Sequence, residues 1–160
     1  MPPPCLDCMS RSYRPCAPNN VFGPALLADA RLEYLTWFDR DQARAEQVAW
    51  SFLCLFTLVQ DDPERAFEVI LHMVERAQTK DNAIDIGCGD LEDLIATHGA
   101  AFVDRIETLA RRSPRFRWVL SGVWPQGKAD TPVWARIAAL QAAGPHMDRG
   151  DDLPPPDGLN

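Results

Sequence analysis

The stretch DPERAFEVILHMVER, residues 62–76, decides the fold. Asp62 can cap the free backbone N–H groups of a helix, and Pro63 suits the first helical position, where its missing N–H is not needed. Apolar side chains then recur every three or four residues, as one buried helix face requires: Ala66, Phe67, Ile70, Met73 and Val74. The stretch predicts an amphipathic helix over residues 63–79.

The same start signal occurs again along the chain. Ser113-Pro114 and Thr131-Pro132 repeat the pairing of a capping oxygen with proline, and Asp90 is a fourth candidate cap with Asp93 three residues later. Together with the apolar spacing, these signals predict helices over residues 24–39, 41–60, 63–79, 90–97, 100–112, 114–122 and 132–142. The segment 41–60 is apolar on every side after its polar start, which predicts a central, buried helix.

These elements predict an all-α fold with about five main helices and one or two short ones. Short connections such as Asp61-Asp62 and Gly99 make consecutive helices antiparallel neighbours. We therefore expect a compact stack of helical hairpins, either a bundle or a short HEAT-like array. We expect one helical domain over residues 22–143, between a proline- and cysteine-rich tail at 1–21, without regular structure, and an acidic, proline-rich tail at 144–160.

Charge is distributed unevenly along the chain. The net charge is −7, and residues 22–82 carry eleven acidic against six basic side chains. Such a field disfavours nucleic acid and attracts a basic protein. Glu64, Glu68 and Glu75 on the outer face of the 63–79 helix are the expected contacts, and Trp124, beside the turn Pro125-Gln126-Gly127, is a candidate aromatic anchor.

A cluster of arginines follows in the second half of the chain. Its members are Arg105, Arg111, Arg112, Arg115 and Arg117. We interpret them as structural, since acids such as Glu92 and Glu107 lie within reach on helical turns.

The longest apolar run, Val48 to Val59, is too short for a membrane span, which needs about 20 residues. The start of the chain lacks the basic and apolar regions of a signal peptide. We therefore expect a cytoplasmic protein without membrane association. The P-loop, G-x-G-x-x-G and G-x-S-x-G motifs are absent from the sequence, and we expect no cofactor.

Two groups of residues could carry chemistry. Glu92, Asp93 and His98 could form a carboxylate–histidine site for general base catalysis, although helix dipoles explain the positions of Asp93 and His98 equally well. Cys5, Cys8 and Cys16 resemble three of the four ligands of a zinc site. Cys88, in Gly87-Cys88-Gly89, is expected to lie in a turn among carboxylates that raise its pKa.

Residues 48–137 resemble an uncharacterised bacterial family of small helical domains of unknown function. The stretches that carry the resemblance are Val48-Ala49-Trp50, Asp62 to Glu68, Gly89 to Ile95, His98-Gly99, Phe102 to Glu107, Ala110-Arg111-Arg112, Phe116-Arg117 and Val123-Trp124. Asp90 departs from the pattern, which has a residue such as proline there. The resemblance implies a helical fold and no particular activity.

The sequence thus favours a non-enzymatic protein-binding module with an acidic face, such as an inhibitor or immunity-type partner of a basic protein. The first alternative is a small enzyme that uses Glu92, Asp93 and His98. The second alternative is a regulatory protein that binds zinc through Cys5, Cys8 and Cys16.

Overall fold

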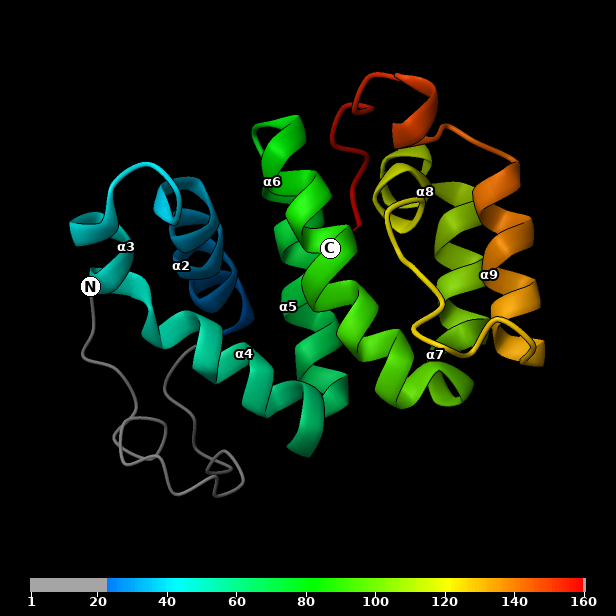
Figure 1. Cartoon of the computed structure of the whole chain (residues 1–160), viewed down its shortest axis with the longest axis horizontal. Helices are drawn as coiled ribbons and strands as arrows, with labels where there is room; N and C mark the ends of the chain where they lie inside the picture. The colour runs from blue at the N-terminus through cyan, green and yellow to red at the C-terminus, as the bar shows by residue number, and fades with distance from the viewer. Residues whose placement is uncertain (1–22, 160) are drawn as a thin grey trace. The chain divides into compact units, whose positions relative to one another are not determined.

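The computed structural model describes residues 23–159, and these residues form helices and connecting loops without any strand (Figure 1). The all-α class is confirmed. The chain separates into two compact units, the first ending at Met73 and the second beginning at Val74. The single helical domain expected over residues 22–143 stays a prediction, because two compact units can belong to one domain.

The first unit contains α2 (Pro24–Trp37), α3 (Gln42–Val48), α4 (Trp50–Asp61) and most of α5 (Pro63–Arg76). α2 packs against both α3 and α4 (Figure 1). Asp41 caps α3 by accepting a hydrogen bond from the backbone N–H of Arg44, at 3.2 Å. Asp62 accepts from the backbone N–H of Arg65, also at 3.2 Å, so the capping predicted for α5 is confirmed.

The helix expected over residues 41–60 is divided at Ala49. The N–H of Ala49 bonds the carbonyl of Glu46 instead of the carbonyl one residue earlier, which tightens the last turn of α3. The side chain of the buried Ser51 donates to the carbonyl of Val48 at 2.6 Å. This hydrogen bond satisfies a carbonyl at the break, so α3 and α4 can part there without leaving it unpaired.

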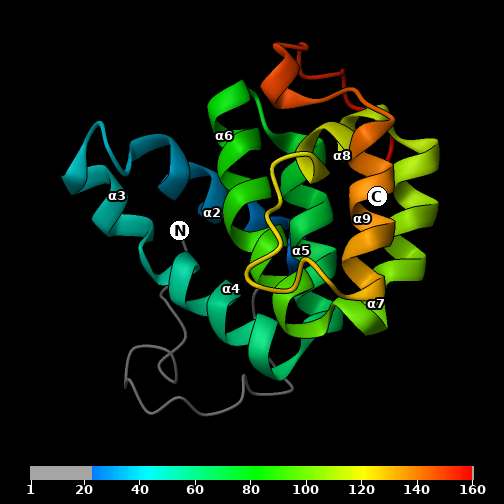
Figure 2. The ribbon, with the colours of Figure 1, turned by 45° about the vertical axis from the view of Figure 1, so that its right-hand side comes forward.

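The second unit contains α6 (Lys80–Asp85), the π-helical turn η1 (Ile86–Leu91), α7 (Glu92–Arg112), α8 (Pro114–Leu120), α9 (Pro132–Ala142) and the short 3₁₀ turn η2 (Met147–Arg149). α7 packs against α8 and α9, which also contact each other (Figure 2). The side chains of Ser113 and Thr131 cap α8 and α9, as predicted. Thr79 caps α6 in the same way.

The structure corrects the prediction for residues 80–91. We expected Gly87-Cys88-Gly89 to form a turn and Asp90 to begin a helix, but both lie inside η1, which continues α6 directly. The reason is a tertiary contact: a Cβ on Gly87 would lie 2.4 Å from the backbone oxygen of Val119, so glycine lets η1 approach α8. Asp90 is buried within this turn, and the residue that precedes α7 is Leu91.

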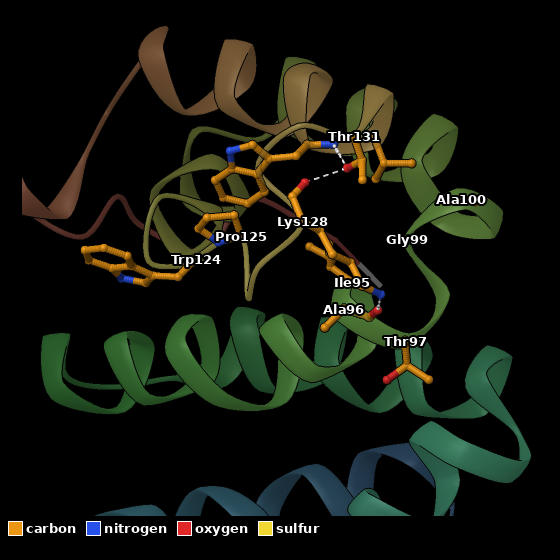
Figure 3. Close-up of a pocket in the computed structure, with 11 residues that line it drawn as sticks. Ile95, Ala96, Thr97, Gly99, Ala100, Trp124, Pro125, Lys128 and Thr131 are labelled. Atoms are coloured by element: carbon orange, nitrogen blue, oxygen red, sulfur yellow. Dashed lines mark hydrogen bonds between the residues drawn. The ribbon is translucent and has the colours of Figure 1, made fainter.

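The two helices expected at 90–97 and 100–112 form one element with a bend. His98 has φ −129° and ψ 16°, outside the helical range, inside α7. The chain changes direction there (Figures 1 and 3). Gly99 follows the bend and is buried, and a Cβ at this position would lie 3.0 Å from the side chain of Val133 in α9. The expected change of direction near Gly99 is therefore present, without a separate loop.

The last residues, 151–159, form an extended segment that we call the C-terminal strap. They have neither helix nor strand, in keeping with their prolines. The strap is nevertheless held: the carboxylate of Glu75 accepts the backbone N–H groups of residues 157, 158 and 159, and Lys80 pairs with Asp152 at 2.7 Å. Ser113 donates to Asp157. The strap is thus a packed part of the second unit.

Candidate functional site

The second unit contains an apolar pocket of about 340 Å³, which we call the Trp124 pocket. It lies between α7, the start of α9 and the loop that joins α8 to α9. Figure 3 shows Trp124 at one end of it and Thr97 and Ala100 at the other. Its lining residues are Ile95, Ala96, Thr97, Gly99, Ala100, Trp124, Pro125, Lys128, Thr131, Val133 and Trp134.

The bend in α7 supplies one wall of the pocket. The Nζ of Lys128 donates a hydrogen bond to the carbonyl of Ala96, two residues before the bend at His98 (Figure 3). Thr131 both caps α9 and donates to the carbonyl of Lys128 at 2.7 Å. The loop therefore bridges α7 and α9, and holds the pocket open between them.

Glu92 holds the other end of the loop. Its side chain is 7% exposed, and its carboxylate accepts the backbone N–H of Trp124 at 2.7 Å and the side-chain amide of Gln126. Gln126 and Gly127 have positive φ values of 47° and 76°, so the chain turns tightly there. Glu92 thus fixes the turn that presents Trp124.

The carboxylate–histidine site expected from the sequence is not assembled around this pocket. Among the described residues, those that line it include neither Glu92, Asp93 nor His98. Glu92 is buried and bonded to the loop, Asp93 is exposed on the first turn of α7, and His98 forms the bend. The three residues therefore do not form a site at this pocket.

The four residues expected to contact a partner have different surroundings. Trp124 is 65% exposed at the edge of its pocket. Glu64 and Glu68 lie one turn apart on α5, and both are exposed. Glu75 instead binds the C-terminal strap through three backbone N–H groups. The Glu75 carboxylate is therefore engaged by the strap within the second unit, whereas Glu64 and Glu68 are exposed.

The cysteines of the described chain have no metal-site geometry. Within residues 23–159, no three side chains of the His, Cys, Asp and Glu types are grouped as metal ligands. Cys5, Cys8 and Cys16 lie outside the described residues, so zinc binding through them stays a prediction. Burial raises the pKa of Cys88, and Glu92, Asp85 and Asp148 raise it further. The expected direction is confirmed, with burial as its main cause.

The first unit exposes a row of aromatic rings, two of which belong to the segment 41–60 that was expected to be buried on every side. The rings run from Phe38 through Tyr34 and Phe52 to Phe56, with centroid separations of 5.3, 6.2 and 6.3 Å. The exposed fractions of Phe38, Phe52 and Phe56 are 58%, 42% and 43%, and Leu53 beside them is 44% exposed. The helix at 50–61 is therefore not buried on all sides, and we call these four rings the aromatic row.

The side chain of a buried arginine lies close to two rings of this row. The guanidinium of Arg31 is 5.2 Å from the centroid of Tyr34 and 5.1 Å from that of Phe52, and Arg31 is 5% exposed. A cation near two ring faces favours a fixed ring arrangement. The row is thus a pre-ordered surface of α2 and α4. In the sequence, its only signal was the excess of apolar residues in α4.

The family of the chain follows from comparison with known proteins. Residues 39–144 match the family of unknown function DUF6869. The chain belongs to this family. The match covers α3 to α9, including both α4 and the Trp124 pocket. The resemblance to a family of unknown function is confirmed by this match.

The comparison with curated proteins and that with solved structures gave no match. Within residues 23–159, no helix combines the length and the apolar character that crossing a bilayer requires.

Proposed function

We propose that this DUF6869 protein is a non-enzymatic module that binds a basic partner protein through the aromatic row of its first unit. The observation that carries the proposal is the exposure of Phe38, just after α2, and of Phe52 and Phe56 in α4, which Tyr34 joins into one row. Contiguous exposed apolar groups commonly mark interaction sites, and aromatic side chains are frequent interface anchors. An inhibitor or immunity-type role would be one form of this activity.

The charge around the row favours a basic partner. Residues 23–73 contain nine acidic and four basic side chains, a net charge of −5. Glu33 precedes Tyr34 in α2, and Asp39 and Asp41 follow Phe38, all three being exposed. Such a surface attracts a positively charged protein and accelerates its association. It also opposes pairing of two copies of this unit, because each copy would bring the same negative charge.

The second unit offers less support for an enzyme. The carboxylate of Glu92 is bonded to the loop at Trp124 and Gln126, and Asp93 and His98 do not join it at the pocket. A general base must reach the proton that it removes. The catalytic alternative therefore ranks below binding. The zinc alternative rests on residues outside those described and stays open.

The proposal is tested with the double variant Phe52→Ala/Phe56→Ala and the control Trp124→Ala. Both change large exposed aromatic side chains, but only the double variant alters the row. Proteins retained from a cell extract at low ionic strength are identified, and the strongest basic candidate is purified for calorimetric titration. We expect the double variant to lose affinity by at least about 10-fold, as for interface anchors, and binding to weaken with salt.

The outcome is decisive only for folded variants, so circular dichroism must first show the helical content and melting temperature of each. A folded double variant that binds the purified basic partner as tightly as the unaltered protein would contradict the proposal. So would failure to retain any basic protein at low ionic strength. A similar loss in Trp124→Ala would place the interface on the second unit instead.

A further inference from the structure

We infer that the Trp124 pocket is a binding site for a small carboxylate with an aromatic or similarly flat apolar body. This site belongs to the second unit and is independent of the proposed protein interface on the first. The inference rests on three features of the pocket: its size and apolar lining, the cation Lys128 at its wall, and the hydrogen bonds within the protein that hold its walls.

The size and lining suit the apolar body. A volume of about 340 Å³ lies at the lower end of the range of small-molecule pockets, about 300–1,000 Å³. Ile95, Val133 and Trp134 supply aliphatic and aromatic surface. Gly99 adds bare backbone, since its place beside Val133 leaves little room for a side chain. A ring system of one or two rings would be removed from water there.

The positive charge of Lys128 at the pocket wall favours an anionic ligand. Lys128 is the one ionisable side chain among the described residues that line the pocket. Its Nζ donates one hydrogen bond to the carbonyl of Ala96, which positions the ammonium group and leaves two further N–H groups for a ligand. With no carboxylate among these lining residues, an anionic ligand would be attracted and a cationic one repelled.

Hydrogen bonds within the protein hold the walls of the pocket. Glu92 holds the loop at Trp124, Lys128 holds it at Ala96, and Thr131 ties Lys128 to the start of α9. A site that is already ordered loses less conformational entropy on binding. These contacts lie on both sides of the pocket, so a ligand meets a defined cavity.

The test uses three probes that share one ring system and differ in charge: 2-naphthoate, 2-naphthamide and 2-naphthylmethylamine. Affinities for the full chain are measured by calorimetry and by ligand-observed NMR. We expect the carboxylate to bind most tightly and the amine most weakly. Lys128→Met keeps most of the length of the side chain but removes its charge and its hydrogen bond to Ala96. The lost hydrogen bond affects all probes alike, so the carboxylate should lose about 10-fold more affinity than the amide.

Lys80→Met is the matched control, because Lys80 is the other lysine of the sequence and lies outside the pocket. Its carboxylate affinity should equal that of the unaltered protein. The inference is wrong if the three probes bind equally, if Lys128→Met and Lys80→Met have the same effect, or if none binds at millimolar concentration. Binding of a peptide with an apolar C-terminal residue, without binding of naphthoate, would also overturn it. These results leave the proposed interface on the first unit untouched.

Discussion

Replacing Glu92 by alanine should loosen the loop at Trp124 and destabilise the second unit. The buried carboxylate accepts one backbone and one side-chain hydrogen bond. Hydrogen bonds to a charged group contribute about 1.5–3 kcal/mol each, and a freed donor that reaches water recovers part of that. Since Trp124 is itself exposed, we take the lower end for both bonds, a loss of about 3 kcal/mol.

The assay combines thermal unfolding with hydrogen exchange. A loss of about 3 kcal/mol corresponds to a fall in melting temperature of about 9 °C for a chain of this size. The backbone N–H of Trp124 should exchange faster by about 30-fold, which corresponds to about 2 kcal/mol of local protection. Glu92→Gln keeps one acceptor oxygen without the charge, so both effects should be intermediate.

Asp93→Asn is the control, because Asp93 follows Glu92 on the first turn of α7 and its side chain is exposed. It should leave the exchange of the Trp124 amide unchanged. The reasoning is refuted if Glu92→Ala melts and exchanges like the unaltered protein. A catalytic role for Glu92 predicts unchanged melting and unchanged exchange in Glu92→Ala, because an active-site carboxylate can be removed without loosening a loop.

Three further changes test other parts of the second unit. Gly87→Ala should cost about 1–3 kcal/mol because the new Cβ meets the oxygen of Val119, whereas Gly89→Ala, with open space around it, should melt like the unaltered chain. Arg115→Met should lower the free energy of unfolding by about 3 kcal/mol, since its buried guanidinium donates to three backbone carbonyls; an exposed arginine in the last turn of α7 is the comparison. The last test replaces the three N-terminal cysteines by serine and measures alkylation of Cys88 by iodoacetamide. Because the raised pKa of Cys88 leaves little thiolate at neutral pH, the reaction should become fast only as the pH rises beyond the usual thiol range. Rapid alkylation at pH 7 would contradict this.

The helix starts could be predicted because they depend on local contacts. Asp62, Ser113 and Thr131 each accept the backbone N–H group three residues later, at 3.2, 2.9 and 3.2 Å. A contact of that span is visible in a short window of sequence. The helices that these residues begin are accordingly present, and the last one covers residues 132–142 as expected.

The segment 80–91 could not be predicted, because distant residues decide its conformation. Two glycines around Cys88 indicate a turn when only neighbours are considered. In the fold, Gly87 instead lies against the backbone of Val119, more than thirty residues away. The role of Glu92 has the same origin, since its partners Trp124 and Gln126 lie 32 and 34 residues along the chain.

The aromatic row shows a different limit of sequence analysis. An apolar helix indicates burial, but the sequence does not say whether the burying surface belongs to the same chain. Leu55 and Leu58 of α4 are fully buried, while Phe52 and Phe56 on its other side are more than 40% exposed. Hydrophobic spacing alone treats these two faces alike.

The arginines of the second unit explain why its basic residues need not imply nucleic-acid binding. Arg115 and Arg117 donate to backbone carbonyls, and Arg111 and Arg136 pair with Glu107. The structural interpretation is confirmed for Arg111, Arg115 and Arg117, whose donors bind groups of the protein itself. A phosphate-binding surface needs cations whose charge and donors face outward. The first unit carries the larger unbalanced charge, with nine acidic and four basic side chains in residues 23–73, and this charge would favour the basic partner that we propose.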